Sequence, residues 1–182
     1  MIGDSEPKYR EMFFTAGRVM NIKLPPRRCF LHPWLSEQTI TLITGFRGVG
    51  KTWFGLGIAK AISTGAAFGP WECRDIAKVM YIDGELPLMD MQDRIRGIGL
   101  DPENQNLIFY LDSIVEMNGY ARPNLGNEEW RDKMLTVLTD EKIDVVNRQP
   151  ETRRSGQVPP KTALYLYLDS HDVFFLKTTQ KF

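Results

Sequence analysis

Apolar positions between residues 29 and 146 follow two patterns that alternate along the chain. Short apolar runs, rich in β-branched residues, predict strands at 38–44, 77–83, 106–112 and 142–146. Between these runs, apolar residues recur at helical spacing. They are Phe54, Ile58, Ala61 and Ile62, then Leu88, Met91, Ile95 and Ile98, then Trp130, Met134, Leu135 and Leu138. Four strands alternating with three helices predict an α/β fold, with crossover helices covering a parallel sheet.

Local signals predict where these elements begin and end. Gly65 is expected to end the first of the three helices, Pro87 suits the first turn of the second, and Asn127 can cap the third. Upstream of the first long strand, residues 29–35 predict a short strand or extended segment that leads into the core. The order of the predicted strands and helices supports a single layered domain.

The length of 182 residues is enough for one domain with a sizeable core. We interpret residues 1–28 as an N-terminal extension with a short helical stretch around "TAGRVMNI", ended by Pro25 and Pro26. Residues 29–146 form the predicted core. Residues 147–182 form a tail of different character, predicted as a hairpin or a disordered segment.

Charge and cysteine content narrow the possible functions only a little. The 23 basic residues balance the 23 acidic ones, so net charge argues neither for nor against nucleic acid as a partner. Cys29 and Cys73 form no disulfide framework and no metal spacing, which argues against a zinc site. Because the sequence has no apolar run of 18 residues and no signal peptide at its start, we expect a cytoplasmic protein without a membrane segment.

The stretch "GFRGVGKT" matches the phosphate-binding pattern G-x-x-x-x-G-K-[ST], between a predicted strand and a predicted helix. Glycines let backbone N–H groups turn toward phosphate oxygens, and the helix adds its positive end. Lys51 is expected to bridge the β- and γ-phosphates of ATP, and the Thr52 hydroxyl to ligate Mg²⁺. The predicted nucleotide-binding residues are Gly45, Phe46, Arg47, Gly48, Val49, Gly50, Lys51, Thr52 and Trp53. Of these, Arg47 occupies a variable position, where a solvated side chain is expected.

"YIDGELP" places Asp83 and Glu85 just past the carboxyl end of a predicted strand, where open α/β sheets bind their ligands. A carboxylate there can orient the water that attacks the γ-phosphate. Either acid can instead cap the helix that begins near Pro87. The pattern alone leaves both interpretations open.

Three segments, "LPPRRCFLHPWL", "GFRGVGKTWFGLGIAKAISTG" and "KVMYIDGELPLMDMQDRI", resemble the RecA-fold AAA-type ATPases related to the RepA-like hexameric replicative helicases. The resemblance covers about residues 13 to 146. It implies a RecA-like P-loop domain, with ATP and Mg²⁺ as cofactors and Glu85 as the catalytic glutamate alongside Lys51. It also implies that full-length relatives act on DNA as homo-oligomeric rings. Trp34 can flank the base in such a protein, although a buried core position is the favoured interpretation for Trp34, as it is for His32.

The family pattern stops near Val146. The expected strand begins with "EKIDVV" but continues into Asn147 and Pro150, without the Walker B aspartate. In one interpretation, "TALYLYLDSHD" is a displaced Walker B strand that ends at Asp169. In the other, which we favour, the chain departs from the family after about residue 146, as a truncated or frame-shifted product would. Alternating Leu and Tyr residues favour a half-exposed strand over a strand buried on both faces.

Three functions therefore remain open from the sequence. The first is an ATP-binding domain of a replication or helicase-type ATPase, with little hydrolysis by this chain alone. The second is a nucleotide-binding fragment that does not hydrolyse ATP. The third, ranked last, is a P-loop kinase. We also expect residues 163–168 to cover the open edge of the P-loop strand, and 163–176 to form a marginal hairpin or stay mobile. Asp169 is then expected not to reach the Mg²⁺ ion.

Overall fold

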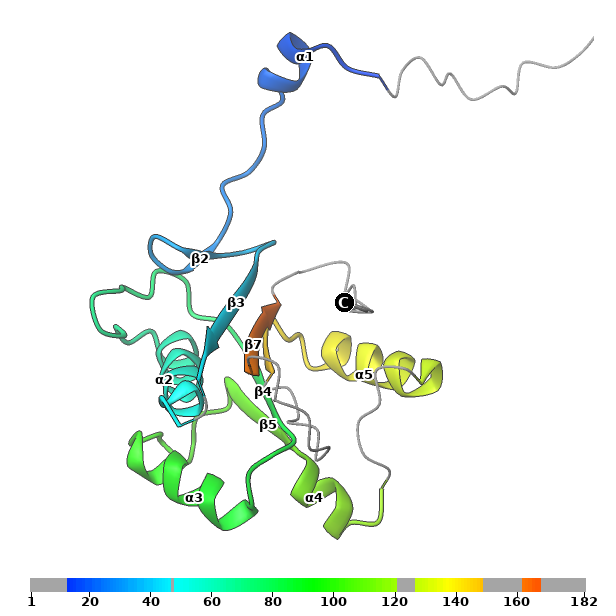
Figure 1. The fold of residues 1–182 in the computed structure, drawn as a ribbon. Helices are drawn as coiled ribbons and strands as arrows, with labels where there is room; N and C mark the ends of the chain where they lie inside the picture. Colours follow the sequence, from blue (N-terminus) through cyan, green and yellow to red (C-terminus); the bar gives the residue numbers. More distant parts are fainter. Residues whose placement is uncertain (1–12, 47, 121–126, 149–161, 168–182) are drawn as a thin grey trace, which may run out of the picture.

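A computed structural model of the chain describes residues 13–46, 48–120, 127–148 and 162–167 (Figure 1). The helices are α1 (Ala16–Met20), α2 (Lys51–Thr64), α3 (Leu88–Gly97), α4 (Asp112–Met117) and α5 (Glu128–Asp140). The strands are β1 (Cys29–Leu31), β2 (Leu35–Ser36), β3 (Ile40–Gly45), β4 (Val79–Asp83), β5 (Leu107–Leu111), β6 (Val145–Arg148) and β7 (Thr162–Tyr167). The α/β fold with a RecA-like P-loop arrangement is confirmed.

The five longer strands form one sheet in the order β3-β7-β6-β4-β5. Strand β4 runs parallel to both β5 and β6, as crossover helices require. Strand β7 lies antiparallel between β3 and β6. Since β7 reverses direction against both neighbours, β3 points the same way as β6, and the P-loop lies at the same edge as the turn after β4.

Side chains of β4 separate the core into two layers. Val79 and Tyr81 face α2 and join Leu56, Ile58 and Ile62 of that helix in the larger cluster. The alternate residues, Met80 and Ile82, pack on the other face against residues of α5, which are Met134 and Leu138. This period of two, expected for a strand buried on both faces, explains why all five β4 residues are buried.

The predicted helix ends agree with the structure. Gly65 follows α2 with a φ of 79° and donates its N–H to the carbonyl of Ala61. The Asn127 side chain accepts a hydrogen bond from the Trp130 N–H at the start of α5. Pro87 immediately precedes α3. These local signals act within one helical turn, which is why sequence alone identifies them.

The N-terminal region consists of an exposed segment followed by a short strand pair packed on the core. Residues 13–27 are all exposed, and α1 stands away from the sheet in Figure 1. The predicted extended segment 29–35 forms a small antiparallel pair, β1 with β2, whose Phe30, Leu31 and Leu35 side chains are buried in the core. Trp34 packs against Trp71 with ring centroids 5.3 Å apart, so its favoured core position is confirmed.

Strand β7 corrects the predictions for the tail. It does pair with β3 along all six residues, but residues 165–167 also pair with β6 on the other side. It is therefore an interior strand of the sheet and not a cover for an outer edge. Because β3 and β6 occupy both edges of β7 at residues 165–167, no edge is left there for a hairpin partner. The structure does not describe residues 168–176 of the predicted hairpin, which include Asp169. It does not describe the Leu and Tyr side chains of β7 either.

Two further differences concern the ends of strands. The predicted strand 106–112 stops at Leu111, because Asp112 already begins the short helix α4, which the sequence analysis did not predict. Strand β6 starts at Val145, three residues later than predicted, after Asp144 accepts a hydrogen bond from the Lys78 N–H. In the described ranges, we find no helix of the length and apolarity that crossing a membrane requires.

Candidate functional site

The P-loop follows β3 and leads directly into the first turn of α2. Gly48 and Gly50 have φ angles of 85° and 92°, in the left-handed region that side chains with a Cβ rarely adopt. Gly50 is also the N-cap residue of α2, so the backbone turns at the point where the helix presents its unpaired N–H groups. A backbone turn that opens onto the free N–H groups of a helix can bind an anion such as phosphate.

Lys51 lies over the loop that precedes it. Its Nζ atom donates to the carbonyl oxygens of Gly45 and Phe46, at 3.0 and 2.8 Å. The ammonium group is thus held next to the loop by two carbonyl oxygens of the loop itself. Phosphate oxygens are stronger acceptors than these neutral carbonyls, so Lys51 can exchange one set of partners for the other.

The other predicted loop residues differ in exposure. The Phe46 and Val49 side chains are exposed, whereas the Thr52 side chain is half-buried in the first turn of α2. Arg47 lies outside the described residues. The Trp53 ring lies next to α3, where the guanidinium carbon of Arg94 is 5.7 Å from the centre of the ring.

The turn after β4 distinguishes the roles of its two acids. Oδ1 of Asp83 accepts hydrogen bonds from the backbone N–H groups of Glu85 and Leu86, at 2.9 and 2.8 Å. Asp83, which is only 2% exposed, therefore closes the turn between β4 and α3, but it does not cap the helix, whose N-cap residue is Pro87 without a side-chain cap hydrogen bond. Glu85 is exposed, and it takes part in this turn through its backbone N–H. Neither acid is the N-cap residue of α3, which begins only at Leu88.

Burial raises the pKa of the Asp83 carboxyl above its usual range. The two backbone N–H groups oppose this shift, the charge of Glu85 adds to it, and the charge of Arg94 opposes it. Arg94 thus interacts with both Asp83 and Trp53. Through Arg94, α3 connects the acidic turn to the first turn of the P-loop helix.

Strand β6 contributes an amide where a carboxylate was expected nearby. Asn147 is fully buried, and its Nδ2 atom donates to the carbonyl of Gly55 in α2, at 2.9 Å. This contact lies beneath the P-loop helix and ties β6 to it. No carboxylate occurs among the β6 residues Val145–Arg148, and the described ranges contain no cluster of three metal-binding side chains.

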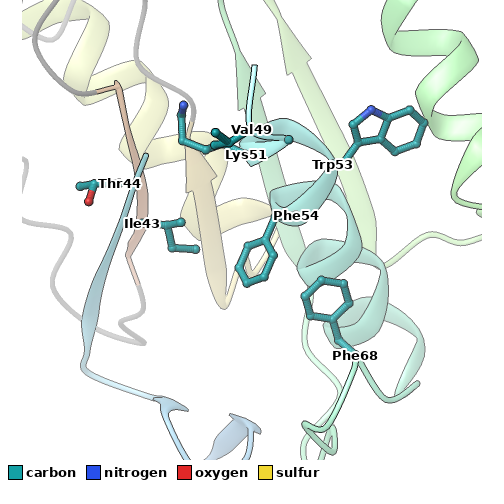
Figure 2. A pocket seen from close by; sticks show the side chains of 8 residues that line it. Ile43, Thr44, Val49, Lys51, Trp53, Phe54 and Phe68 are labelled. Carbon is teal, nitrogen blue, oxygen red and sulfur yellow. The ribbon is translucent and has the colours of Figure 1, made fainter. Parts of the chain in front are cut away.

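A cavity of about 560 Å³ adjoins the P-loop on the side of α2 (Figure 2). It is lined by Ile43, Thr44, Val49, Gly50, Lys51, Trp53, Phe54 and Phe68. The sequence analysis assigned Phe54 to the core face of a helix and left Phe68 in a loop. The sequence does contain one signal for this cavity, which is the aromatic residue Phe54 two positions after Thr52, near the start of the P-loop helix.

A family profile described as an AAA domain matches residues 5–147. The chain belongs to this AAA domain family. AAA domains are nucleotide-binding domains of the ATPase type, in agreement with the P-loop geometry of this chain. No curated protein and no solved structure matches it significantly.

Proposed function

We propose that this AAA domain binds ATP with Mg²⁺ and is the RecA-like domain of a replication or helicase-type ATPase, related to the RepA-like hexameric helicases. The observation that carries the proposal is the P-loop itself. It lies at the carboxyl end of β3, turns at two glycines with positive φ, and leads into α2 with Lys51 over its mouth.

Mg²⁺ fits the residues at this site. The ion typically keeps several waters and takes only one or two protein ligands beside the substrate phosphates, so the half-buried Thr52 hydroxyl is a sufficient first ligand. When bound, Mg²⁺ would neutralise part of the phosphate charge. Lys51, the residue before Thr52, would supply a second positive charge.

Glu85 is the residue we propose to orient the attacking water. Asp83 forms the turn and is held by two backbone N–H groups, while Glu85 extends from that turn as an exposed carboxylate. Its position after β4 is at the same sheet edge as the P-loop. The assignment rests on this position and on the resemblance of the "DGE" turn to the family.

We propose that hydrolysis by this chain alone is slow. The buried Asn147 amide is neutral and bonded to Gly55, so β6 supplies no carboxylate to hold Mg²⁺ through water within its described residues. The family match also ends at residue 147, where the sequence departs from the expected pattern. A domain that binds ATP without turning it over is the second candidate, and Asn147 favours it.

The resemblance to the RepA-like hexameric helicases carries the last part of the proposal. We propose that the domain works in the cytoplasm within a homo-oligomeric ring that acts on DNA. Its two cysteines are free thiols, which suits a reducing compartment.

The decisive test is to remove the Lys51 ammonium group. Lys51→Ala should weaken ATP binding by at least about tenfold, or roughly 1.4 kcal/mol, because no other described lysine lies at the loop. Isothermal titration calorimetry with ATP and Mg²⁺ measures this. Lys133→Ala removes an exposed lysine on α5 and serves as the control. Equal affinity in Lys51→Ala and the parent would refute the phosphate site.

Measuring binding and turnover together distinguishes the two candidates. Binding with measurable, Glu85-dependent phosphate release supports the ATPase. Binding without release at saturating ATP supports the non-hydrolysing domain.

A further inference from the structure

The cavity beside the P-loop has two chemically different ends. Gly50 and Lys51 form one end, next to the phosphate loop. Ile43, Phe54 and Phe68 form the other, and Figure 2 shows these three side chains gathered below Lys51. The cavity is therefore continuous from the phosphate loop to an apolar, aromatic wall.

The aromatic wall is built into the fold. Phe54 and Phe68 meet edge to face, with ring centroids 5.1 Å apart. The loop that carries Phe68 is fixed by two backbone hydrogen bonds between Phe68 and Trp71, at 2.9 and 3.1 Å. Trp71 in turn contacts the ring of Phe54, so three aromatic rings hold one another in place.

Gly57 sets the position of the Phe68 ring. A Cβ atom at Gly57 would lie 2.3 Å from Cε2 of Phe68, so the ring lies directly on the glycine backbone. Gly57 is six residues after Lys51, which places it roughly 9 Å further along the helix axis at 1.5 Å per residue. The Phe68 ring therefore lies roughly 9 Å beyond Lys51 along the helix, a length that the sugar and base of a nucleotide can span.

We propose that this apolar end binds the base of the nucleotide whose phosphates the P-loop holds, by contact with the Phe54 and Phe68 rings. The inference rests on the proposed nucleotide binding. Every base has a π face that an aromatic ring can contact. The volume of about 560 Å³ is in the usual range for small-molecule sites.

The same wall limits discrimination between bases. Ile43, Phe54 and Phe68 have no side-chain hydrogen-bond donor or acceptor, and the Thr44 side chain points away from them in Figure 2. Selection of one purine over another requires polar groups that match the edge of the base. The site therefore accepts ATP and GTP with similar affinity.

A ligand series on the unmodified chain tests this directly. Calorimetry with Mg²⁺ compares ATP, GTP, ribose 5-triphosphate and inorganic tripolyphosphate. We expect ATP and GTP to agree within about threefold, and both to bind at least about tenfold more tightly than ribose 5-triphosphate, because only they bring a base to the rings.

Variants of the aromatic residues test whether the base contacts the Phe54 and Phe68 rings. Phe68→Leu keeps apolar volume but removes the ring, and should weaken ATP binding at least about fivefold while leaving tripolyphosphate binding unchanged. Gly57→Ala, which displaces the same ring, should act in the same direction. The controls are Tyr110→Leu, which removes a ring that packs against Trp130, and Gly17→Ala, where an added Cβ meets nothing within 4 Å.

Each outcome of the series decides the inference. Ribose 5-triphosphate binding as tightly as ATP would overturn it while leaving the phosphate site intact. A preference for ATP over GTP above about tenfold would overturn it too, because polar groups would then read the base. Failure of all four ligands to bind would overturn it together with the proposed function.

Discussion

Strands β3 and β4 belong to one sheet and end at the same edge, yet their surroundings differ. All five residues of β4 are buried, while the residues of β3 alternate between exposed and partly buried. Strand β4 has a strand on each side and helices over both faces. Strand β3 is at the end of the sheet, paired only with β7 among the described strands, and α2 covers one of its faces.

This difference in burial suggests that β4 contributes mainly to the stability of the fold and β3 mainly to the position of the phosphate-binding loop. The centre of the core surrounds β4, which holds the acidic turn in a fixed position. The P-loop extends from the less covered strand, where Ile40 and Leu42 are about half exposed at 51% and 53%. A ligand that binds the P-loop of the folded chain but not the unfolded chain stabilises the whole fold by mass action. We therefore expect substitutions in the two strands to differ in kind and in size.

The largest expected effect compares the same change in both strands. Ile82→Ala removes a side chain packed between Met134 and Leu138, and should lower the free energy of unfolding by about 2–5 kcal/mol. Ile40→Ala removes a half-exposed side chain and should lower it by less than about 1 kcal/mol. Urea unfolding of both variants measures the difference. Equal losses would mean that β3 is as well covered as β4.

The next effect concerns chemistry and not stability. Glu85→Gln keeps the shape of the side chain but cannot accept a proton, so it should reduce phosphate release by about 10²-fold or more. ATP affinity should stay within about threefold, because Glu85 does not form the P-loop. Glu103→Gln, an exposed acid in the loop before β5, is the control. Loss of folding in Glu85→Gln would instead mean that the Glu85 carboxylate is needed to hold the turn after β4.

Much of this arrangement was predictable because its causes are local. The glycines of the P-loop, Gly65 and Asn127 act over one turn, and the apolar run before Asp83 specifies a buried strand wherever it pairs. The prediction that residues 45–52 bind phosphate rests on the same local chemistry. One motif thus identified both the loop and the helix after it.

What could not be predicted depends on contacts that are distant in sequence. The antiparallel insertion of β7 joins residues 162–167 to β3, more than a hundred positions away. The aromatic wall joins Phe54 to Phe68 through a loop whose composition carries no such signal. The different positions of Asp83, which closes the turn after β4, and of exposed Glu85 depend on burial, which the pattern "DGE" does not encode.

A smaller effect should appear in the pH dependence of stability. The Asp83 carboxyl has a pKa that burial raises in the folded chain, so it takes up a proton on folding. Its contribution to the free energy of unfolding therefore falls as pH rises from the unfolded pKa to the raised one. Asp83→Asn keeps an oxygen to accept the two backbone N–H groups but does not titrate.

The matching measurement is urea unfolding of Asp83→Asn and the parent between about pH 4 and pH 7. The stability of the variant minus that of the parent should increase with pH. A constant difference across this range would show that the folded and unfolded chains hold the Asp83 proton equally.

The smallest expected effect is at Asp169, which lies outside the described residues. Strand β7 begins with Thr162 opposite Gly45, beside the P-loop, and ends with Tyr167 opposite Ile40, at the other end of β3. Because the chain leaves β7 at the end remote from the P-loop, we expect no contact between Asp169 and Mg²⁺. Asp169→Ala should then change Mg²⁺-dependent ATP binding by less than about twofold, measured by calorimetry with and without the ion. A large loss of the Mg²⁺ dependence would mean that this strand runs the other way as a displaced Walker B strand, and would make the chain an ATPase in its own right.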